Sequence, residues 1–353
     1  MNFDLSFYKD KKVLITGHTG FKGAWMTVML ANLGAKVIGY SSCSKKDIKL
    51  FDLCDVKKQI IHIKGDVRDL NHMFYVFEKY KPEIVIHMAA QPIVRESYKN
   101  PVETYYTNVM GTVNVCEAVR RAESVKSFLN VTTDKVYENK EWEWGYREND
   151  PLDGYDPYSN SKSCSELVTH SYKNSFFCDR NIAVSTSRAG NVIGGGDFAI
   201  DRIIPDCIRA VINRNDIVVR NPYSIRPYQH VLEPIYAYLM IAAKQYEDHR
   251  YQSWYNVGPD DSDYRCTGEL VDMFVECWGE GIKWVNKSEK GLHEANILKL
   301  DCSNIKSKLG WKPRWHLKIA MDKIVEWSKV WISGGNVREV MDKQISEFIS
   351  SDV

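Results

Sequence analysis

The sequence lacks the features that mark several classes of protein. Its nine cysteines are scattered and include no CxxC pair, so we predict no metal site and no redox motif. The 47 basic and 46 acidic residues leave a formal net charge of +1, which gives no reason to expect nucleic acid or an anionic membrane as a partner. Reduced thiols in a cytoplasmic protein are the simplest interpretation.

Long hydrophobic runs are also absent. No stretch approaches the ~20 apolar residues of a membrane span, and residues 1–12 lack the apolar core of a signal peptide. We therefore expect a soluble cytoplasmic protein. With 353 residues, 44% of them hydrophobic, the chain can bury a sizeable core and is long enough for about two domains at roughly 150 residues each.

Strand and helix patterns alternate through the first half of the chain. Strands are predicted at 11–16, 35–40, 60–63, 82–87, 126–132 and 182–187, and helices at 24–33, 70–79, 101–121 and 156–177. This order predicts an α/β fold with a doubly wound parallel (Rossmann) sheet that binds ligands at the carboxyl ends of its strands.

We expect residues 1–190 to form a dinucleotide-binding domain that also holds the catalytic residues. Residues 191–353 would form mainly a smaller α/β lobe for the substrate, with the chain free to cross between the two. Helices are predicted in this half near 231–246, 267–278 and 317–332.

A glycine-rich turn, GHTGFKG at 17–23, joins the first strand directly to the first helix. Glycines allow a tight turn and let a pyrophosphate approach the helix N-terminus, although any turn uses glycine. In this context the turn predicts cofactor binding by Gly17, His18, Thr19, Gly20, Phe21 and Lys22.

The second strand ends without the acidic residue that would bind the adenosine ribose of NAD. Ser41 stands there, followed by a polar loop through Lys46, so the pattern leaves both NAD and NADP open. Asp66 would cap the helix beginning at Leu70, accept from an adenine amino group, or do both. Further cofactor contacts are expected from Ser41, Asp66, Val67, Ala89, Ala90, Gln91 and Asn108.

The motif YxxxK occurs three times, at Tyr8/Lys12, Tyr75/Lys79 and Tyr158/Lys162. Only the third follows the carboxyl end of the fifth strand, where Thr133, Asp134 and Lys135 also lie. A lysine one helical turn from the tyrosine could stabilise a tyrosinate by lowering the phenol pKa from ~10. We predict that Thr133, Asp134, Lys135, Tyr158 and Lys162 form an acid–base site that also contacts the cofactor.

Three arginines, Arg202, Arg220 and Arg226, are spaced through the second half of the chain. Arginine offers forked donors that suit a second diphosphate. Surface salt bridges are the alternative interpretation.

Together these motifs resemble the extended short-chain dehydrogenase/reductase family. The resemblance rests on GHTGFKG, on Thr133-Asp134, on YSNSK at 158–162 and on RAGN at 188–191. Within that family the chain is most similar to nucleotide-sugar 4,6-dehydratases, and to the branch that uses CDP-glucose in particular. The further matches are AQPIVR at 90–95, TYYTNVMGT at 104–112, TDKVYEN at 133–139, WGYRENDP at 144–151, GNVIGGGD at 190–197 and RPYQHVLE at 226–233. Lys135 replaces the glutamate usual in the dTDP-glucose and GDP-mannose branches.

The resemblance implies a hydro-lyase that uses NAD, with NADP as the alternative. Tyr158, held by Lys162, would take the C4 hydroxyl proton while hydride passes from C4 to NAD, with Thr133 bonded to the same oxygen. Asp134 would protonate the leaving C6 hydroxyl, and hydride would return to C6. Lys135 would be the C5 base or would only stabilise the enolate.

The resemblance also implies a homodimer, or a higher homo-oligomer, paired through helices near 103–121 and 158–176, and a place in deoxysugar or surface-polysaccharide synthesis. It implies substrate contacts from Arg95, Asn191, Arg202, Arg226, His230 and Glu294. The base specificity rests on resemblance alone. The competing hypotheses are a dehydratase for another nucleotide hexose, an NAD-dependent nucleotide-sugar 4-epimerase and a non-catalytic NAD sensor.

Overall fold

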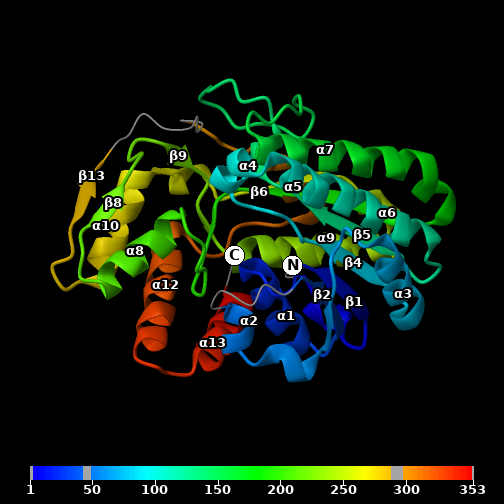
Figure 1. The fold of residues 1–353 in the computed structure, drawn as a ribbon, viewed down its shortest axis with the longest axis horizontal. Helices are drawn as coiled ribbons and strands as arrows, with labels where there is room; N and C mark the ends of the chain where they lie inside the picture. Colours follow the sequence, from blue (N-terminus) through cyan, green and yellow to red (C-terminus); the bar gives the residue numbers. More distant parts are fainter. Residues whose placement is uncertain (1–2, 43–48, 288–296, 352–353) are drawn as a thin grey trace.

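A parallel sheet of seven strands forms the centre of the protein (Figure 1). The computed structural model describes residues 3–42, 49–287 and 297–351. The strand order is β11-β6-β5-β4-β1-β2-β3. The strands are β1 (Lys12–Thr16), β2 (Lys36–Ser41), β3 (Ile61–Lys64), β4 (Ile84–His87), β5 (Ser127–Val131), β6 (Ala183–Ala189) and β11 (Trp254–Val257). The predicted Rossmann sheet is confirmed, and β11 is a seventh strand that the pattern did not predict.

Helices cover both faces of this sheet (Figure 1). One core contains the apolar residues of α3 (Leu70–Tyr80) and α6 (Gly111–Arg121), beside α7 (Pro157–Tyr172). The core on the other face contains α1 (Phe21–Asn32), α9 (Leu232–Glu247) and α13 (Val337–Ser350). All residues of α9 from Leu232 to Ala243 are buried, because this helix lies against β5 and β6 and also packs on α1.

Two predicted helices contain π turns. Between 101 and 121 the chain forms α5 (Pro101–Tyr105), a π turn (Tyr106–Met110) and α6. A second π turn, Lys173–Phe177, follows α7. The first of these turns contains Asn108, whose side chain accepts a hydrogen bond from the Gln91 backbone N–H at 2.8 Å and donates to the Ser161 hydroxyl at 2.9 Å. Such turns often occur near functional sites.

The smaller part of the molecule has its own core, formed by α8 (Ile203–Ile212), α10 (Thr267–Trp278) and α12 (Leu317–Ile332) around the pair β8 (Ile217–Val219) and β13 (Trp284–Asn286). Two short strand pairs contribute residues to the wall of the cavity described below. They are β7 (Val192–Ile193) with β10 (Gln229–His230) and β9 (Ile225–Arg226) with β12 (Arg265–Cys266). The chain crosses between the two parts, since α9, β11 and α13 return to the large sheet after residue 190. The division at residue 190 stays a prediction.

The remaining helices are short. They are α2 (Leu50–Leu53), α4 (Val94–Lys99), α11 (Ser303–Leu309) and 3-10 turns at Leu5–Tyr8, Val56–Gln59, Asp134–Val136, Cys178–Arg180, His249–Tyr251 and Asp261–Asp263. Within the described ranges, no helix has the length and apolar character needed to cross a membrane. Nor do the described His, Cys, Asp and Glu side chains form a group that could hold a metal ion.

The turn between β1 and α1 needs glycine at two places. Gly17 has a φ of +77°, and a Cβ there would lie 2.8 Å from the Ala89 nitrogen. A Cβ at Gly23 would lie 2.2 Å from the Gly17 carbonyl oxygen. The backbone of the turn therefore packs directly on the helix and on the end of β4.

We expect Gly23→Ala to lower the free energy of unfolding by about 1–3 kcal/mol, because the added methyl group meets backbone atoms that cannot move aside. Gly20→Ala is the matched control, since its Cβ would lie 3.4 Å from the same carbonyl oxygen in ordinary extended backbone with a φ of −72°. Urea unfolding without cofactor measures both variants. Equal stabilities would contradict the steric argument.

Candidate active site

One large cavity, of about 1810 Å³, runs from the carboxyl ends of the strands into the smaller part of the molecule. It brings together most of the residues that the sequence singled out. Those lining it are Gly17, Thr19, Gly20, Phe21, Lys22, Ser41, Asp66, Val67, Ala89, Ala90, Gln91, Arg95, Thr133, Asp134, Lys135, Tyr158, Asn191, Arg202 and Arg226.

Three other predicted residues lie behind the cavity wall. The buried His18 ring points to His62, with 2.7 Å between its Nε2 and Nδ1 of His62. Asn108 fixes the segment at Gln91, as described above. Lys162 is buried on α7 and donates to the Val131 carbonyl at 3.1 Å.

Two predictions are wrong. His230 does not reach the cavity, because β10 leads straight into the buried α9 and the imidazole packs among core aromatics, 4.9 Å from the Trp315 ring centre. Asp66 does not cap α3. Asp69 does so by accepting from the His72 backbone N–H at 3.0 Å, while Asp66 accepts from the Arg68 side chain at 2.6 and 2.9 Å.

Two further predictions fall on parts of the chain that are not described. Glu294 lies outside the described residues, and so does most of the polar loop after Ser41, from 43 to 48.

The acid–base residues meet where β5 ends. Thr133 donates to Asp134 Oδ1 at 2.9 Å, and the 3-10 turn Asp134–Val136 carries Lys135 toward the smaller part of the molecule. Lys135 Nζ lies 3.9 Å from Asp134 Oδ1 and 3.5 Å from Asn191 Oδ1. Asp134 is only 1% exposed, and its Oδ2 has no hydrogen-bond partner among the described residues, so this oxygen can bond to a ligand.

The tyrosine and lysine of the third YxxxK motif, Tyr158 and Lys162, are both shielded from water by the surrounding protein. Burial raises the pKa of Tyr158 to about 12, although a hydrogen bond with Thr133 acts in the opposite direction. Burial lowers the pKa of Lys162 to about 8. The predicted lowering of the phenol pKa is thus not present in the protein alone. A positive group bound in the cavity would be needed to bring it down.

Lys22 adds another partly desolvated cation. Burial, with the positive charges of Lys162 and Arg202, lowers the pKa of Lys22 to about 8. Its ammonium lies 5.9 Å from the centre of the Tyr238 ring on α9. This side of the cavity therefore brings the positive charges of Lys22, Lys162 and Arg202 near the carboxylates of Asp134 and Asp197.

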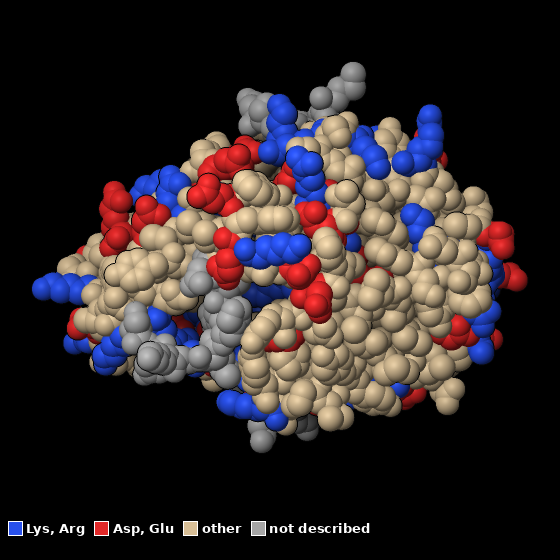
Figure 2. Space-filling model, turned by 90° about the horizontal axis from the view of Figure 1, so that it is seen from above, with Lys and Arg blue, Asp and Glu red and all other residues tan. Residues whose placement is uncertain are grey.

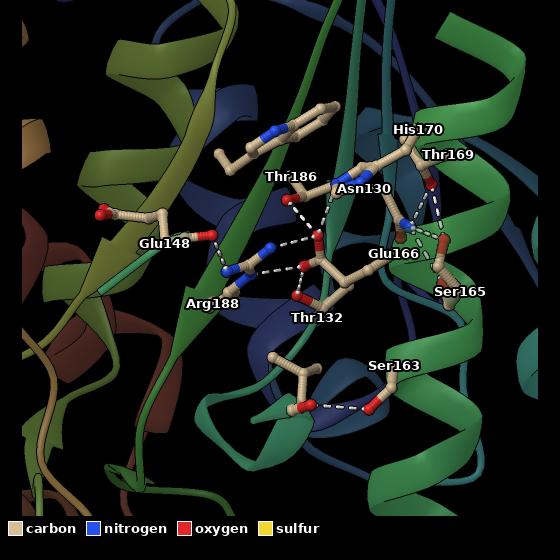
Figure 3. A network of polar contacts seen from close by, with 12 residues as sticks. Asn130, Thr132, Glu148, Ser163, Ser165, Glu166, Thr169, His170, Thr186 and Arg188 are labelled. Carbon is tan, nitrogen blue, oxygen red and sulfur yellow. Dashed lines mark hydrogen bonds and ion pairs between the residues drawn. The ribbon is translucent and has the colours of Figure 1, made fainter. Parts of the chain in front are cut away.

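A buried network behind the cavity fixes α7 in place (Figure 3). The Arg188 guanidinium on β6 holds both oxygens of Glu166 at 3.0 Å, and both side chains are fully buried. Thr132, directly after β5, and Thr186 on β6 donate to the same carboxylate. Burial alone would raise the pKa of Glu166, but Arg188, with His170 and Thr132, holds it well below its usual range. We did not anticipate this network from the sequence.

Arg188→Met should lower the free energy of unfolding by about 3–5 kcal/mol, because it leaves the Glu166 carboxylate buried without its partner. It should also reduce turnover, since α7 carries Tyr158. Arg120→Met, which breaks the exposed pair with Glu117, is the control and should change little. Denaturant unfolding checks the comparison. Equal effects would show that the buried pair does not hold the helix.

Lys162→Met should abolish turnover and yet raise the free energy of unfolding at pH 7 by about 1–3 kcal/mol, since the native protein buries an ammonium whose pKa is lowered to about 8. Between about pH 8 and pH 10.4, Lys162 keeps its proton in the unfolded chain but loses it in the folded protein. The free energy of unfolding of the wild type should therefore rise as pH rises through that window.

Urea titrations at several pH values without cofactor measure this gain, which the methionine variant should lose. Lys79→Met, in the exposed YxxxK motif on α3, serves as the control. Loss of stability in Lys162→Met at pH 7 would contradict the desolvation argument.

A dinucleotide fits the part of the cavity next to α1. Gly17 and Gly20 leave the backbone of the turn open, and the helix N-terminus that follows favours a pyrophosphate. The Thr19 and Ser41 hydroxyls lie 2.8 Å apart at the end of β2, and Asp66 and Val67 follow β3. These residues suit a cofactor that spans the strand ends.

Comparisons with known proteins agree with this geometry. A family model described as GDP-mannose 4,6 dehydratase matches residues 14–324. The CDP-glucose 4,6-dehydratase of Salmonella typhimurium is 46% identical over 99% of both chains. The dTDP-D-glucose 4,6-dehydratase of Bos taurus is 26% identical over 90% of this chain and 88% of its own.

Solved structures share the fold at lower identity. UDP-glucose 4-epimerase from Thermotoga maritima, with UDP-glucose, has a TM-score of 0.79 at 20% identity and covers 91% of this chain and 99% of its own. The dTDP-glucose 4,6-dehydratase of Bacillus anthracis, in complex with NAD, has a TM-score of 0.74 at 19% identity over 90% and 96% of the two chains. The family match and the full-length relative show that the chain belongs to the GDP-mannose 4,6-dehydratase family, within the extended short-chain dehydrogenases/reductases.

Proposed function

We propose that the protein is a hydro-lyase that converts CDP-D-glucose to CDP-4-dehydro-6-deoxy-D-glucose and water. The observation that carries the proposal is the full-length similarity to the Salmonella CDP-glucose 4,6-dehydratase, together with a cavity that gathers Thr133, Asp134, Lys135 and Tyr158. The reduced cysteines and the small-molecule substrate fit a cytoplasmic enzyme of deoxysugar synthesis.

NAD is the proposed cofactor, and when bound it would accept a hydride from C4 of the sugar and return it at C6. Gly17 and residues 19–22 would hold its pyrophosphate, and Asp66 and Val67 its adenosine end. The small side chains of Ala89 and Ala90 would let it approach the protein backbone closely. NADP is the alternative, because no acidic side chain stands at Ser41 to repel a 2′-phosphate.

Each residue of the cluster takes one proton-handling role. Tyr158 removes the proton of the C4 hydroxyl, and Thr133, which is bonded to Asp134, orients that oxygen. Oxidation at C4 gives a ketone that acidifies the C5 proton. Asp134 then protonates the C6 hydroxyl, which leaves as water when the C5 proton is removed. The positive charges of Lys162 and Lys22, together with that of the cofactor when it is bound, would favour the tyrosinate.

Lys135 is suited to the step at C5 by its contact with Asp134. The elimination needs a proton on the acid and a free electron pair on the base. One proton transfer within the pair, from the ammonium to the carboxylate, supplies both. A lysine that only stabilises the enolate is the alternative, with another group as base.

Lys135→Glu tests this role. We expect the variant to lose most exchange of the C5 hydrogen with solvent, because its carboxylate would lie beside that of Asp134 and disturb both protonation states. Incubation with CDP-glucose in deuterated water, followed by mass spectrometry, measures the exchange. Full exchange in the variant would exclude Lys135 as an obligatory base.

The reaction itself is tested by mass. Incubation with CDP-glucose should yield a product lighter by one water, whereas a nucleotide-sugar 4-epimerase would leave the mass unchanged. An epimerase would need Tyr158 and Lys162 but no acid at Asp134. Parallel incubations with dTDP-glucose, UDP-glucose and GDP-mannose test the base, and a preference for one of them would overturn the assignment to CDP-glucose.

Tyr158→Phe should lower kcat by at least about 100-fold, in line with the usual contribution of an acid–base group. Tyr75→Phe removes the same hydroxyl from the exposed YxxxK motif and should leave kcat unchanged. Full activity in Tyr158→Phe would instead favour a different catalytic site. A wild-type protein that turns over no nucleotide hexose would favour an NAD sensor.

A homodimer is supported by an apolar stripe on the outer helices. Val102, Tyr106 and Met110, one helical turn apart on α5 and the π turn, are exposed, as is Leu167 on α7. Exposed apolar side chains that form one patch mark association surfaces. We propose that two copies pair through this stripe, and sedimentation of the protein would test it.

A further inference from the structure

The segment that leads from Gly196 into α8 borders the cavity and carries charges of both signs. Asp197, Asp201 and Arg202 all line the cavity, and Arg202 is paired with Asp197 at 2.9 Å. Figure 2 shows acidic and basic side chains lying together around a hollow on this side of the molecule. Acidic side chains thus lie beside the arginines that face the cavity and offset part of their positive charge.

Asp201 contacts an arginine from each part of the molecule. Its Oδ1 lies 2.8 Å from Arg220 Nη1, just after β8 in the smaller part, and 3.9 Å from Arg95 Nη1, on α4 beside the large sheet. Arg95 and Arg220 are each 35% exposed, and Asp201 is 26% exposed. A single carboxylate thus bridges the two walls of the cavity.

The backbone at Asp201 is left-handed, with a φ of +63°, and the neighbouring Ile200 is exposed although it lines the cavity. Aspartate tolerates this conformation well. The contacts with Arg95 and Arg220 are therefore what fixes the position of the Asp201 carboxylate between the two walls.

We propose that Asp201 determines ligand specificity by occupying Arg95 and Arg220 when no ligand is bound, so that a nucleoside diphosphate must displace its carboxylate. A carboxylate and a phosphate offer the same forked acceptors to a guanidinium, and the two therefore compete for it. The proposal rests on the proposed function only for the identity of the ligand.

The competition with Asp201 sets a minimum binding free energy that an anion must supply to reach the two arginines. Every anion that engages these arginines loses the same free energy in breaking the pairs with Asp201. A nucleotide sugar still binds, because its base and sugar make further contacts. Free phosphate and pyrophosphate have neither a base nor a sugar and bind more weakly.

The alternative is that Asp201 only orients the arginines for the ligand. The two cases predict opposite signs. Removal of the carboxylate tightens diphosphate binding if Asp201 competes, and weakens it if Asp201 is a positioning residue.

Asp201→Asn is the suitable variant, because asparagine tolerates a left-handed backbone and only the charge is removed. Arg220 keeps its contact with Asp206 at 3.5 Å in the variant and so stays near its place. Asp216→Asn is the matched control: it makes the same change in net charge at an exposed position at the opposite end of β8 from Arg220.

Calorimetric titration of the NAD-loaded protein with CDP, inorganic pyrophosphate and cytidine measures the effect. We expect Asp201→Asn to lower the Kd of CDP and of pyrophosphate by about two- to five-fold at low ionic strength, the size of a partly exposed ion-pair contribution, with a smaller gain as salt is added. Cytidine, which has no phosphate, should bind equally to both proteins, and Asp216→Asn should match the wild type.

An unchanged or raised Kd for CDP and pyrophosphate in Asp201→Asn would overturn the proposal. An equal tightening of cytidine would also overturn it, because the effect would not depend on phosphate. The proposed function fails separately, if the wild-type protein binds UDP or GDP in preference to CDP. The pyrophosphate titration still decides the role of Asp201 in that case.

Discussion

The bidentate pair between Glu166 and Arg188 is the constraint on which the site depends. A pair buried this completely stabilises a fold only if its remaining donors and acceptors are satisfied, and here Thr132, Thr186, Tyr137 and the Glu148 carbonyl do so. It ties α7 to β5 and β6 at one register. Glu166, Lys162 and Tyr158 follow one another at four-residue steps along one face of α7, so fixing the first brings the other two to the end of β5, beside Thr133.

The charges in the cavity are arranged for ligands that the protein alone does not supply. Burial raises the pKa of Tyr158 to about 12 and lowers those of Lys22 and Lys162 to about 8, so each of these groups resists its charged form. A bound cofactor with a positive ring and a substrate with two phosphates reverse part of this cost. The charge state of Tyr158 and Lys22 therefore depends on what is bound in the cavity.

Much of the fold could be predicted because local pattern determines it. Residues 11–33 combine a buried strand, a glycine turn and a helix, and the structure follows that order. The strand β11 was missed because its four residues, WYNV, include only one β-branched side chain and a polar asparagine. The helix α9 was assigned to the smaller lobe because sequence does not show against what an apolar helix packs. His230 was misplaced for the same reason. Arg188 lies on β6 but directly follows the strand predicted at 182–187, and Glu166 lies on the same helix face as Lys162.

Two contacts cross the cavity, one beside the acid–base residues and one beside the arginines. Lys135 reaches Asn191, which leads into β7, while Arg95 reaches Asp201 ahead of α8. Both partners in the second half of the chain belong to the stretch between β6 and α8, from 190 to 202. A movement of that stretch on ligand binding would therefore change the diphosphate end and the surroundings of Lys135 together. The chain also crosses back to the sheet through α9 and β11, so the two parts are joined at several places and not only by this short stretch.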